Sequence, residues 1–317
     1  MTLDPQKTAF LFPGQGSQTL GMGRDLSLKE HVAAHVFREA GLILGYPLSE
    51  ICWDGPVEVL NDTYYTQPAL LTHSIAVLRT FRDHFPDFKP ATTAGHSVGE
   101  YSALVAAEAL SFPDALRLVQ ERGRTMKASG EQQPGGMAAV LGLSVPEVES
   151  VCTQVTAEEE GGVWVANDNC PGQVVISGEL TALSMASERL VEIGARKVVR
   201  LAISISSHSP IMEYSLAEYY QALEATTIHR PQIPIIGNVN AASLLSAAEV
   251  QNELHLQLVS RVRWTESIRM MIDNGITTFI EMGPGSVLTG LLKRIDRSVS
   301  GIALDTPDSF ASLPIHT

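Results

Sequence analysis

The stretch Gly95-His96-Ser97-Val98-Gly99-Glu100 places a serine between two glycines, each two residues away from it. This spacing is typical of a sharp turn from a strand into a helix, because a Cβ at either glycine would collide with the neighbouring backbone. In such a turn the Ser97 hydroxyl projects outward, and the Val98 N–H faces any developing oxyanion. The motif predicts a nucleophilic serine, although the same spacing also occurs in ordinary loops.

The residues around the serine predict a strand before it and a helix after it. Residues 88–94 hold few large apolar side chains, so they indicate a strand only weakly. Apolar residues in 98–109 follow the three-and-four spacing of an amphipathic helix, which ends at Ser111-Phe112-Pro113. The helix after Ser97 is therefore the better supported element.

Composition limits the class of protein. A chain of 317 residues with 44% hydrophobic and 18% charged residues can bury a large core, in one large domain or two smaller ones. A net charge of −13 argues against nucleic-acid binding. Cys52, Cys152 and Cys170 lie far apart, which fits a reducing compartment and predicts neither a disulfide framework nor a zinc site. No apolar run approaches the ~20 residues of a membrane span, so we expect a cytoplasmic protein with no membrane partner.

Strand and helix patterns alternate along most of the chain, which predicts an α/β fold. An N-terminal strand at 7–12 runs into a loop of small residues at 13–18. Helical patterns follow at 31–44, 67–84, 98–109 and 113–127. After residue 205 the alternation resumes, with helices at 212–225, 247–258, 265–274 and 287–295 and strands at 233–239, 277–282 and 298–305. The polar stretch 128–136 is expected to be a linker, and residues 310–317 a tail.

The central third of the chain has a different order of elements. Extended patterns at 137–143, 163–165, 174–177 and 196–203 enclose two helical patterns, one opened by Ser144-Val145-Pro146-Glu147 and one at 180–193. The resulting order, β-α-β-β-α-β, predicts a small inserted domain of the ferredoxin-like α+β type. We expect this domain at residues 131–204, with a large α/β domain built from residues 1–130 and 205–317.

A serine nucleophile needs a base, and His208 is the best placed of nine histidines. It lies in the small polar loop 203–210 at the end of an extended run, where catalytic groups often lie. On the residues alone, an ordinary loop histidine at the surface is the favoured interpretation of His208. No set of histidines, cysteines and carboxylates has the spacing of a metal site; His31 and His35 share a helix face but lack a third ligand. We therefore predict no metal.

Five stretches together resemble the successive motifs of malonyl-CoA:acyl carrier protein transacylases. They occur in the order of that family and span about residues 7 to 305. The stretches are Phe12-Pro13-Gly14-Gln15-Gly16-Ser17-Gln18, Tyr65-Thr66-Gln67-Pro68-Ala69-Leu70, Gly95-His96-Ser97-Val98-Gly99-Glu100-Tyr101-Ser102-Ala103, Asn169-Cys170-Pro171-Gly172-Gln173-Val174-Val175-Ile176-Ser177-Gly178 and Glu281-Met282-Gly283-Pro284-Gly285. Five ordered motifs are far more specific than the serine motif alone.

The resemblance implies a fold and a reaction. It implies an α/β-hydrolase-like large domain with a parallel sheet and a nucleophile elbow. Ser97 would take the malonyl group from coenzyme A as an ester, and His208 would accept the serine proton and later serve the carrier thiol. Backbone N–H groups of Gln15 and Val98 would hold the oxyanion. The reaction implied in this way needs no cofactor, because malonyl-CoA is the substrate.

The resemblance also assigns substrate-binding residues. The arginine at the position of Arg122, 25 residues after Ser97, would hold the free malonyl carboxylate, which suits a planar fork of donors. Met126 would line the pocket, and Gln67 would either line it or only support it. The backbone carbonyl of Gln257 would orient the histidine in place of the usual carboxylate. On the residues alone, a solvated helix charge is the favoured interpretation of Arg122, and Met126 is equally an ordinary core residue.

Several functional alternatives stay open at this point. Ser207, just before the histidine, leaves the choice between malonyl and methylmalonyl undecided. A free-standing enzyme of fatty acid synthesis is favoured over a trans-acting acyltransferase of a polyketide synthase, over a serine esterase or thioesterase, and over a non-catalytic scaffold. The expected partner is an acidic carrier protein, and the basic clusters that could meet it are Lys293, Arg294 and Arg297, or Arg196, Lys197 and Arg200. We expect a monomer.

Overall fold

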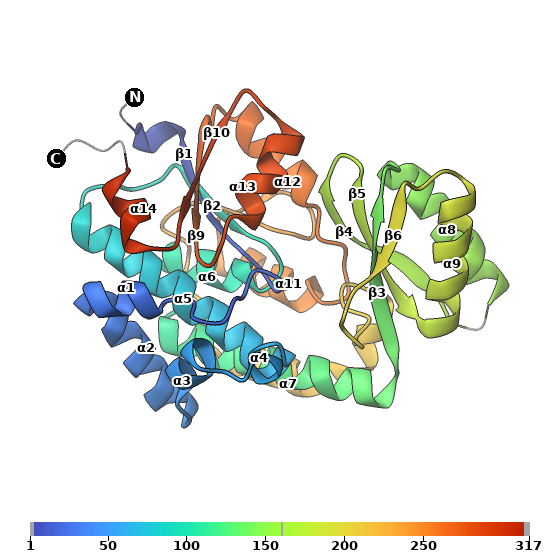
Figure 1. The fold of residues 1–317 in the computed structure, drawn as a ribbon, viewed down its shortest axis with the longest axis horizontal. Coiled ribbons are helices and arrows are strands. Elements are labelled where there is room, and N and C mark those ends of the chain that lie inside the picture. The colour runs from blue at the N-terminus through green and yellow to red at the C-terminus, as the bar shows by residue number, and fades with distance from the viewer. Residues whose placement is uncertain (1–2, 160, 314–317) are drawn as a thin grey trace.

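The computed structural model describes residues 3–159 and 161–313, which form two sheets side by side in an elongated molecule (Figure 1). The six-stranded sheet has the order β10-β9-β1-β2-β7-β8, and the four-stranded sheet has the order β4-β5-β3-β6. We refer to them as the large sheet and the small sheet. The side chains of the candidate active site lie where the two sheets face each other.

The large sheet is parallel except at one edge. Its strands are β1 (Thr8–Phe12), β2 (Thr92–Gly95), β7 (Ile235–Ile236), β8 (Ser243–Leu244), β9 (Thr278–Met282) and β10 (Ser300–Leu304). Only the β7–β8 pair is antiparallel. All five residues of β1 are buried, as expected of a parallel strand covered by helices on both faces. The predicted α/β class with a mostly parallel sheet is confirmed.

Helices cover both faces of the large sheet. They are α1 (Arg24–Lys29), α2 (His31–Leu44), α3 (Leu48–Trp53), α4 (Val57–Leu60), α5 (Thr63–His84), α6 (Gly99–Ala106), α7 (Phe112–Gln132), α10 (Ala217–Ala225), α11 (Ala247–Leu256), α12 (Trp264–Asp273), α13 (Val287–Ile295) and α14 (Pro307–Ala311), with short 3-10 turns at Pro5–Lys7 and Pro210–Ser215. Helix α5 begins four residues before the predicted start, because the Asp62 side chain caps it by accepting from the Tyr64 N–H. Sixteen of its side chains are buried, so it forms the centre of the helical layer.

The small sheet is antiparallel throughout. It contains β3 (Gly135–Leu141), β4 (Val163–Cys170), β5 (Gln173–Glu179) and β6 (Lys197–Arg200), and it packs on α8 (Val145–Glu158) and α9 (Leu180–Glu192). The predicted chain order β-α-β-β-α-β is present. Ser144 and Glu147 form a capping box that starts α8. One face of the sheet is buried under both helices, and the other carries Met137 and Val175 toward the large sheet.

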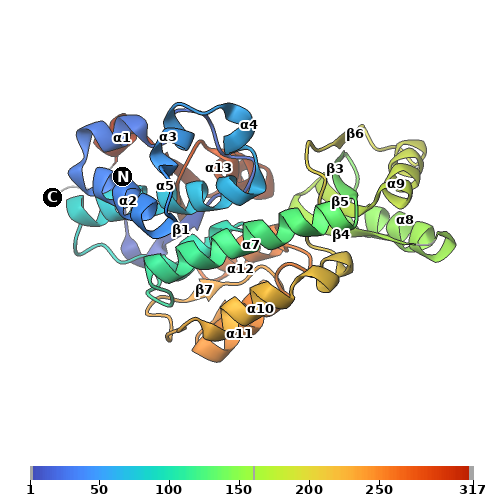
Figure 2. The same cartoon turned by 90° about the horizontal axis from the view of Figure 1, so that it is seen from below.

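The predicted linker at 128–136 is wrong for most of its length. Helix α7 continues to Gln132, and β3 begins at Gly135. Figure 2 shows α7 running along the molecule from the helices of the large sheet to the small sheet. The small residues Ser129 and Gly130 serve close packing here, because a Cβ on Gly130 would lie 2.6 Å from the Ser204 carbonyl oxygen. A composition typical of a loop therefore marks a tight contact between two elements.

The structure also bears on the predicted C-terminal tail and on the prediction for the cysteines. The predicted tail begins inside α14, where Phe310 is buried, so this part of the prediction is wrong; residues 314–317 lie outside the described residues. The thiols of Cys52, Cys152 and Cys170 are free and buried, and burial raises the pKa of each. Among the described residues, no helix is both long enough and apolar enough to cross a membrane.

Candidate active site

The turn that carries Ser97 is tight enough to exclude any side chain at its two glycines. A Cβ on Gly95 would lie 2.0 Å from the Gly99 carbonyl carbon, and a Cβ on Gly99 would lie 2.2 Å from the Phe12 carbonyl oxygen. Ser97 itself has a φ of +52°, in the left-handed region that non-glycine residues rarely adopt. The strand β2 thus turns directly into α6, and the serine stands at the top of the turn as the motif predicted.

An amide side chain from another part of the chain holds this turn in place. Asn238, just after β7, accepts a hydrogen bond from the Ser97 N–H at 2.8 Å and donates one to the Gly95 carbonyl at 2.7 Å. One side chain therefore satisfies the backbone on both sides of the strained residue. Because the Ser97 N–H is used in this way, it is not free to bind a ligand.

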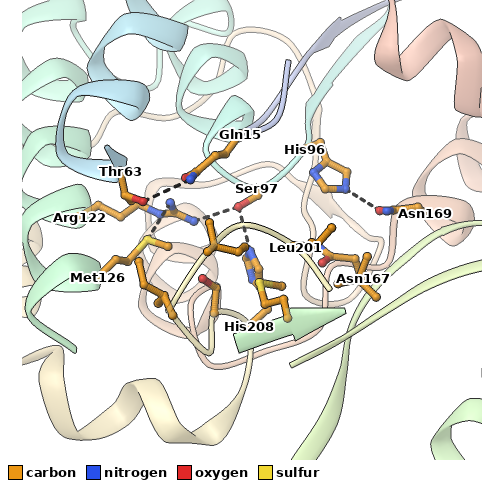
Figure 3. A pocket seen from close by; sticks show the side chains of 15 residues that line it. Gln15, Thr63, His96, Ser97, Arg122, Met126, Asn167, Asn169, Leu201 and His208 are labelled. Carbon is orange, nitrogen blue, oxygen red and sulfur yellow. Dashed lines mark hydrogen bonds between the residues drawn. The ribbon is translucent and has the colours of Figure 1, made fainter. Parts of the chain in front are cut away.

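His208 lies against the serine and is oriented by backbone carbonyl groups. Its Nε2 is 2.8 Å from Ser97 Oγ (Figure 3). Its Nδ1 is 2.9 Å from the Gln257 carbonyl oxygen and 3.2 Å from that of Ser260. Carbonyl oxygens only accept hydrogen bonds, so Nδ1 carries the proton and Nε2 is the bare nitrogen. The imidazole is therefore in the tautomer that can accept the Ser97 hydroxyl proton.

The surroundings of His208 keep the imidazole neutral. Its side chain is buried, and this burial, together with the nearby positive charge of Arg122, lowers the pKa of His208 to about 3. A histidine with so low a pKa is uncharged at neutral pH and available as a base. The carbonyl groups at Nδ1 act in the opposite direction but are the weaker influence.

Arg122 brings a buried positive charge to the nucleophile. The residue is 1% exposed, and its Nη2 donates to Ser97 Oγ at 3.1 Å and to Gln257 Oε1 at 3.0 Å. Its Nη1 donates to Gln67 Oε1 at 2.8 Å, and its Nε has no partner among the described residues. None of these acceptors is a carboxylate. A buried guanidinium that is not hydrogen-bonded to an acid is costly, so its position favours an incoming anion.

Gln67 and Met126 form the wall behind the guanidinium. Gln67 is fully buried on α5, and its Nε2 lies 3.0 Å from the Met126 sulfur. Arg122 Nη1 also lies 3.3 Å from this sulfur. A thioether is only a weak acceptor, so it directs the guanidinium without neutralising it. Both residues therefore contact Arg122, and Met126 also lines the pocket.

The two predicted oxyanion donors are the residue after Ser97 and a loop residue that lines the same cavity. Val98 is the residue at the N-terminus of α6, and Gln15 lies in the loop after β1, held by a hydrogen bond from its Nε2 to Thr63 Oγ1 at 3.2 Å. Within the described residues, neither backbone N–H has a hydrogen-bond acceptor. Free N–H groups at a helix start are suited to bind a developing negative charge.

These groups open into one cavity between the two sheets. The cavity has a volume of about 150 Å³. Its polar side comes from Gln15, Ser97, Arg122 and His208, and its apolar side from residues on or beside the small sheet (Figure 3). These apolar residues are Met137, Val175, Leu201, Ile203 and Ile205. Ser207 also lines the cavity, next to the histidine.

Comparison with known proteins decides the family. The model of the acyl transferase domain matches residues 9–306. The chain belongs to the acyl transferase domain family. A malonyl CoA-acyl carrier protein transacylase of Bacillus subtilis (strain 168) is 45% identical to it over 98% of this chain and 97% of that protein. The resemblance predicted from the five motifs is thus confirmed.

Solved structures of this family have the same fold. An acyl carrier protein S-malonyltransferase from Vibrio cholerae aligns with a TM-score of 0.93 at 40% identity, covering 96% of this chain and 99% of that one. A malonyl-transacylase in complex with a type II PKS acyl-carrier protein aligns with a TM-score of 0.93 at 38% identity, covering 97% of this chain and 98% of that one. The match with the family therefore extends over nearly the whole chain.

The structure adds site residues of this acyl transferase that the sequence did not single out. Besides Asn238 and Ser260, these include His96, whose Nε2 lies 2.8 Å from Asn169 Oδ1 at the rim of the cavity. Burial lowers the pKa of His96. His96 and Asn169 both lie in the quoted motifs, but only the fold shows that their side chains contact each other. Asn238 has no local signal, because its partners are backbone groups about 140 residues earlier in the chain.

Two carboxylates between Ser97 and His208 in the sequence have other partners. The Asp114 carboxylate accepts from the Ser111 hydroxyl, whose oxygen accepts from the Asp114 N–H at the start of α7, and Asp168 accepts from Thr265 Oγ1 at 2.7 Å. Neither contacts His208. Among the described residues there is also no group of three potential metal ligands. The geometry thus consists of a serine, a neutral histidine and a buried arginine.

Proposed function

We propose that the protein transfers the malonyl group from malonyl-CoA to the phosphopantetheine thiol of an acyl carrier protein, supplying extender units for fatty acid synthesis. One observation carries the choice of acyl group: Arg122 Nη2 lies 3.1 Å from Ser97 Oγ, and within the described part of the chain Arg122 is hydrogen-bonded to no carboxylate. In malonyl-CoA the free carboxylate is one methylene from the thioester carbonyl. An arginine beside the nucleophile can therefore hold the carboxylate while the serine attacks the carbonyl.

The first half-reaction forms an ester on Ser97. The Ser97 oxygen attacks the thioester carbon while its proton passes to His208 Nε2, and the carbonyl π-bond becomes an oxyanion. The backbone N–H groups of Gln15 and Val98 stabilise this oxyanion. Collapse of the intermediate breaks the carbon–sulfur bond, and His208 returns the proton to the coenzyme A thiol. Malonyl-Ser97 and free coenzyme A are the products.

The second half-reaction runs the same steps with another thiol. The carrier thiol gives its proton to His208 and attacks the ester carbonyl; the carbon–oxygen bond then breaks, and Ser97 recovers the proton. Nucleophile, base and oxyanion donors are all protein groups, so the proposed reaction uses no cofactor or metal. An apolar wall from the small sheet would keep water from the ester, which favours transfer over hydrolysis.

The finer description of the fold is also proposed. In the small sheet, the strands counted in chain order are arranged fourth, first, third, second, which supports a ferredoxin-like domain at residues 131–204. The parallel sheet and the tight turn at Ser97 support an α/β-hydrolase-like domain at 1–130 and 205–317. We further propose a monomeric, cytoplasmic enzyme that binds neither membrane nor nucleic acid; three buried free thiols and a net charge of −13 support this.

The carrier is proposed to dock on basic residues that the fold brings together. Arg294 Nη2 donates to the Pro171 carbonyl at 3.2 Å, so α13 lies against the turn between β4 and β5. That turn touches the end of β3, where the Gly142 N–H donates to the Gly172 carbonyl, and the Arg196 N–H donates to the Leu141 carbonyl. The two basic clusters predicted as alternatives thus lie beside the same pair of turns. Their positive charge would complement an acidic carrier.

Intact-mass spectrometry tests the proposed function. We expect wild-type protein with malonyl-CoA to gain one malonyl group, and the added mass to pass to a carrier protein supplied afterwards. Ser97→Ala should show no adduct. Malonate released to water without transfer would indicate a thioesterase, and a wild type without an adduct would contradict the proposal. Fatty-acid and type II polyketide carriers, each offered separately, distinguish the two pathways, because a structural neighbour was solved with a carrier of the latter kind.

A further inference from the structure

Gln257 contacts Ser97, His208 and Arg122, the three side chains of the proposed mechanism. Its backbone carbonyl accepts from His208, its Oε1 accepts from Arg122 at 3.0 Å, and its Nε2 donates to the Ser97 carbonyl at 3.1 Å. The same Nε2 donates to the carboxyl of Glu100. Only the nitrogen of an amide can donate and only its oxygen can accept. The Gln257 side chain therefore has a single orientation that satisfies all its partners, and Glu100 is one of the groups that fix it.

Glu100 is a buried carboxyl directly behind the nucleophile. It lies on α6 three residues after Ser97, and its side chain is fully buried. One of its oxygens accepts from Gln257, whereas the other, Oε1, has no donor among the described residues. Its neighbour is Glu253 of α11, which is 3% exposed and accepts from the Val239 N–H at 2.7 Å. Two acidic side chains thus meet in the interior beside the active site.

A proton shared by the two carboxyls explains how they can be buried together. Burial, followed by the charge of Glu253, raises the pKa of Glu100 well above its usual range, and burial also raises the pKa of Glu253. Adjacent carboxyls in such a place hold one proton between them, because two negative charges repel strongly there. That proton supplies the donor that Glu100 Oε1 lacks. The pair then carries one negative charge, near enough to Arg122 for the two charges to interact.

We propose that Glu100 is a positioning residue for acyl transfer: its carboxyl holds the Gln257 amide in the orientation in which the amide oxygen accepts from Arg122, and so fixes the residue whose backbone carbonyl accepts from His208. The inference rests on the proposed function, since it concerns the same site. A carboxyl with a purely structural task exists in the same protein for comparison. Glu281 is also fully buried, and it accepts from the Leu288 and Thr289 N–H groups at the start of α13.

Substitutions at Glu100 separate positioning from packing. Glu100→Met keeps the side-chain length and removes the acceptor; because hydrogen bonds to charged groups are strong, we expect kcat/KM for malonyl-CoA to fall about 10-fold to 100-fold. The preference for malonyl over acetyl should fall as well, by about fivefold or more, because Arg122 loses its fixed position. Glu100→Gln still offers an oxygen to Gln257, so both quantities should stay within about fivefold of wild type. In Glu253→Gln both quantities should also stay within about fivefold of wild type, because the amide introduced at position 253 always has a proton to donate to Glu100 Oε1.

Glu281→Gln is the matched control for loss of a buried carboxylate. We expect it to lower Tm and to leave both kcat/KM per folded enzyme and the malonyl preference unchanged. If Glu100→Met does not fold, Glu100→Asp withdraws the carboxyl by one methylene and should show the same two losses. A folded Glu100→Met or Glu100→Asp with wild-type rate and preference would overturn the inference. Equal losses in Glu253→Gln and Glu100→Met would overturn the shared proton, whereas a wild type that forms no malonyl adduct would overturn the proposed function instead.

Discussion

The large and the small sheet contribute different kinds of side chain to the cavity around Ser97. Ser97 follows β2 and Arg122 lies on α7, so the groups proposed to react or to bind charge belong to the large-sheet part. The small sheet supplies Met137 and Val175, which are apolar, and Asn169 at the rim. Figure 3 shows Gln15, Arg122 and His208 around Ser97, and His96 and Asn169 as a separate polar pair.

The difference follows from what each kind of sheet presents. Parallel strands end together at one edge, where helices begin, so free N–H groups and loops from distant parts of the chain meet there. The antiparallel small sheet has one face under α8 and α9, and its opposite face presents apolar side chains to the cavity. We infer that the large sheet carries the chemistry, and that the small sheet controls what reaches it.

Removal of the base gives the largest expected effect on this division. We expect His208→Ala to lower the rate of malonyl transfer on the order of 10⁴-fold or more, because nucleophile and base act as one unit. For the same reason, the double variant with Ser97→Ala should be no slower than either single variant. Steady-state transfer to carrier protein measures this. Additive losses in the double variant would show that the two residues act independently.

Removal of the guanidinium comes next and changes selectivity. Arg122→Ala should lower kcat/KM for malonyl-CoA about 10-fold to 100-fold, which corresponds to the ~1.5 to 3 kcal/mol of a charged hydrogen bond. Acetyl-CoA has no carboxylate, so its kcat/KM should change much less. Arg124→Ala is the matched control, since Arg124 lies on the same helix but is exposed and paired with Glu121. Equal losses for both acyl groups would contradict the assigned role of Arg122.

A smaller effect is expected outside the cavity, at the proposed carrier surface. Reversing charge in Lys197→Glu together with Lys293→Glu should raise KM for the carrier roughly tenfold at low salt and less at high salt. The amount of malonyl adduct formed from malonyl-CoA should stay within about threefold. Lys89→Glu, an exposed residue before β2 at the opposite end of that strand from Ser97, serves as control. If KM for the carrier changes neither with salt concentration nor with charge reversal, the carrier does not dock on this surface.

The apolar wall tests whether the small sheet takes part in the reaction. Val175→Ala widens the cavity without touching a reactive group, so malonyl transfer should stay within about threefold. Release of malonate to water should rise instead, because the wall shields the ester. Comparing hydrolysis with transfer on the same acylated protein gives both numbers. A loss as large as that of Arg122→Ala would show that the small sheet does more than form a wall.

The smallest expected effect is the response to acid. With an ordinary histidine of pKa near 6.5 as the base, activity would fall about 25-fold between pH 7 and 5. Because burial and Arg122 hold the pKa of His208 at about 3, the base stays neutral, and kcat/KM should fall by less than about twofold over this range.

The same low pKa of His208 predicts how acid changes stability. A group whose pKa is lowered by folding stabilises the fold above its unfolded pKa. Acid between about pH 6.5 and 3 should therefore lower Tm less in His208→Gln than in wild type.

The turn at Ser97 and the α/β class could both be predicted from the sequence alone. Glycine at 95 and 99 is a backbone requirement, since any side chain there would meet the chain within about 2 Å, and such a requirement is visible in the sequence itself. The strand and helix patterns predicted the α/β class for a similar reason. Periodic burial leaves a local trace that needs no knowledge of partners.

The helix end at 128–132 shows where this logic fails. Small polar residues have two uses, in a flexible loop and in a close contact between elements, and composition does not distinguish them. Gly130 serves the second use, against Ser204. The sequence therefore predicted a linker where the fold has the last turn of a long helix.

The sequence by itself determined the candidate serine, the family motifs and the alternation of elements, because each depends on neighbouring residues. Only the tertiary structure decided the environment of the site: that His208 is neutral, that Arg122 is hydrogen-bonded to no carboxylate among residues 3–159 and 161–313, and that Gln257 contacts Glu100, His208 and Arg122. These properties come from burial and from hydrogen bonds between residues 25 to 160 positions apart. Burial and distance in space have no local pattern, so the chain must fold before they exist.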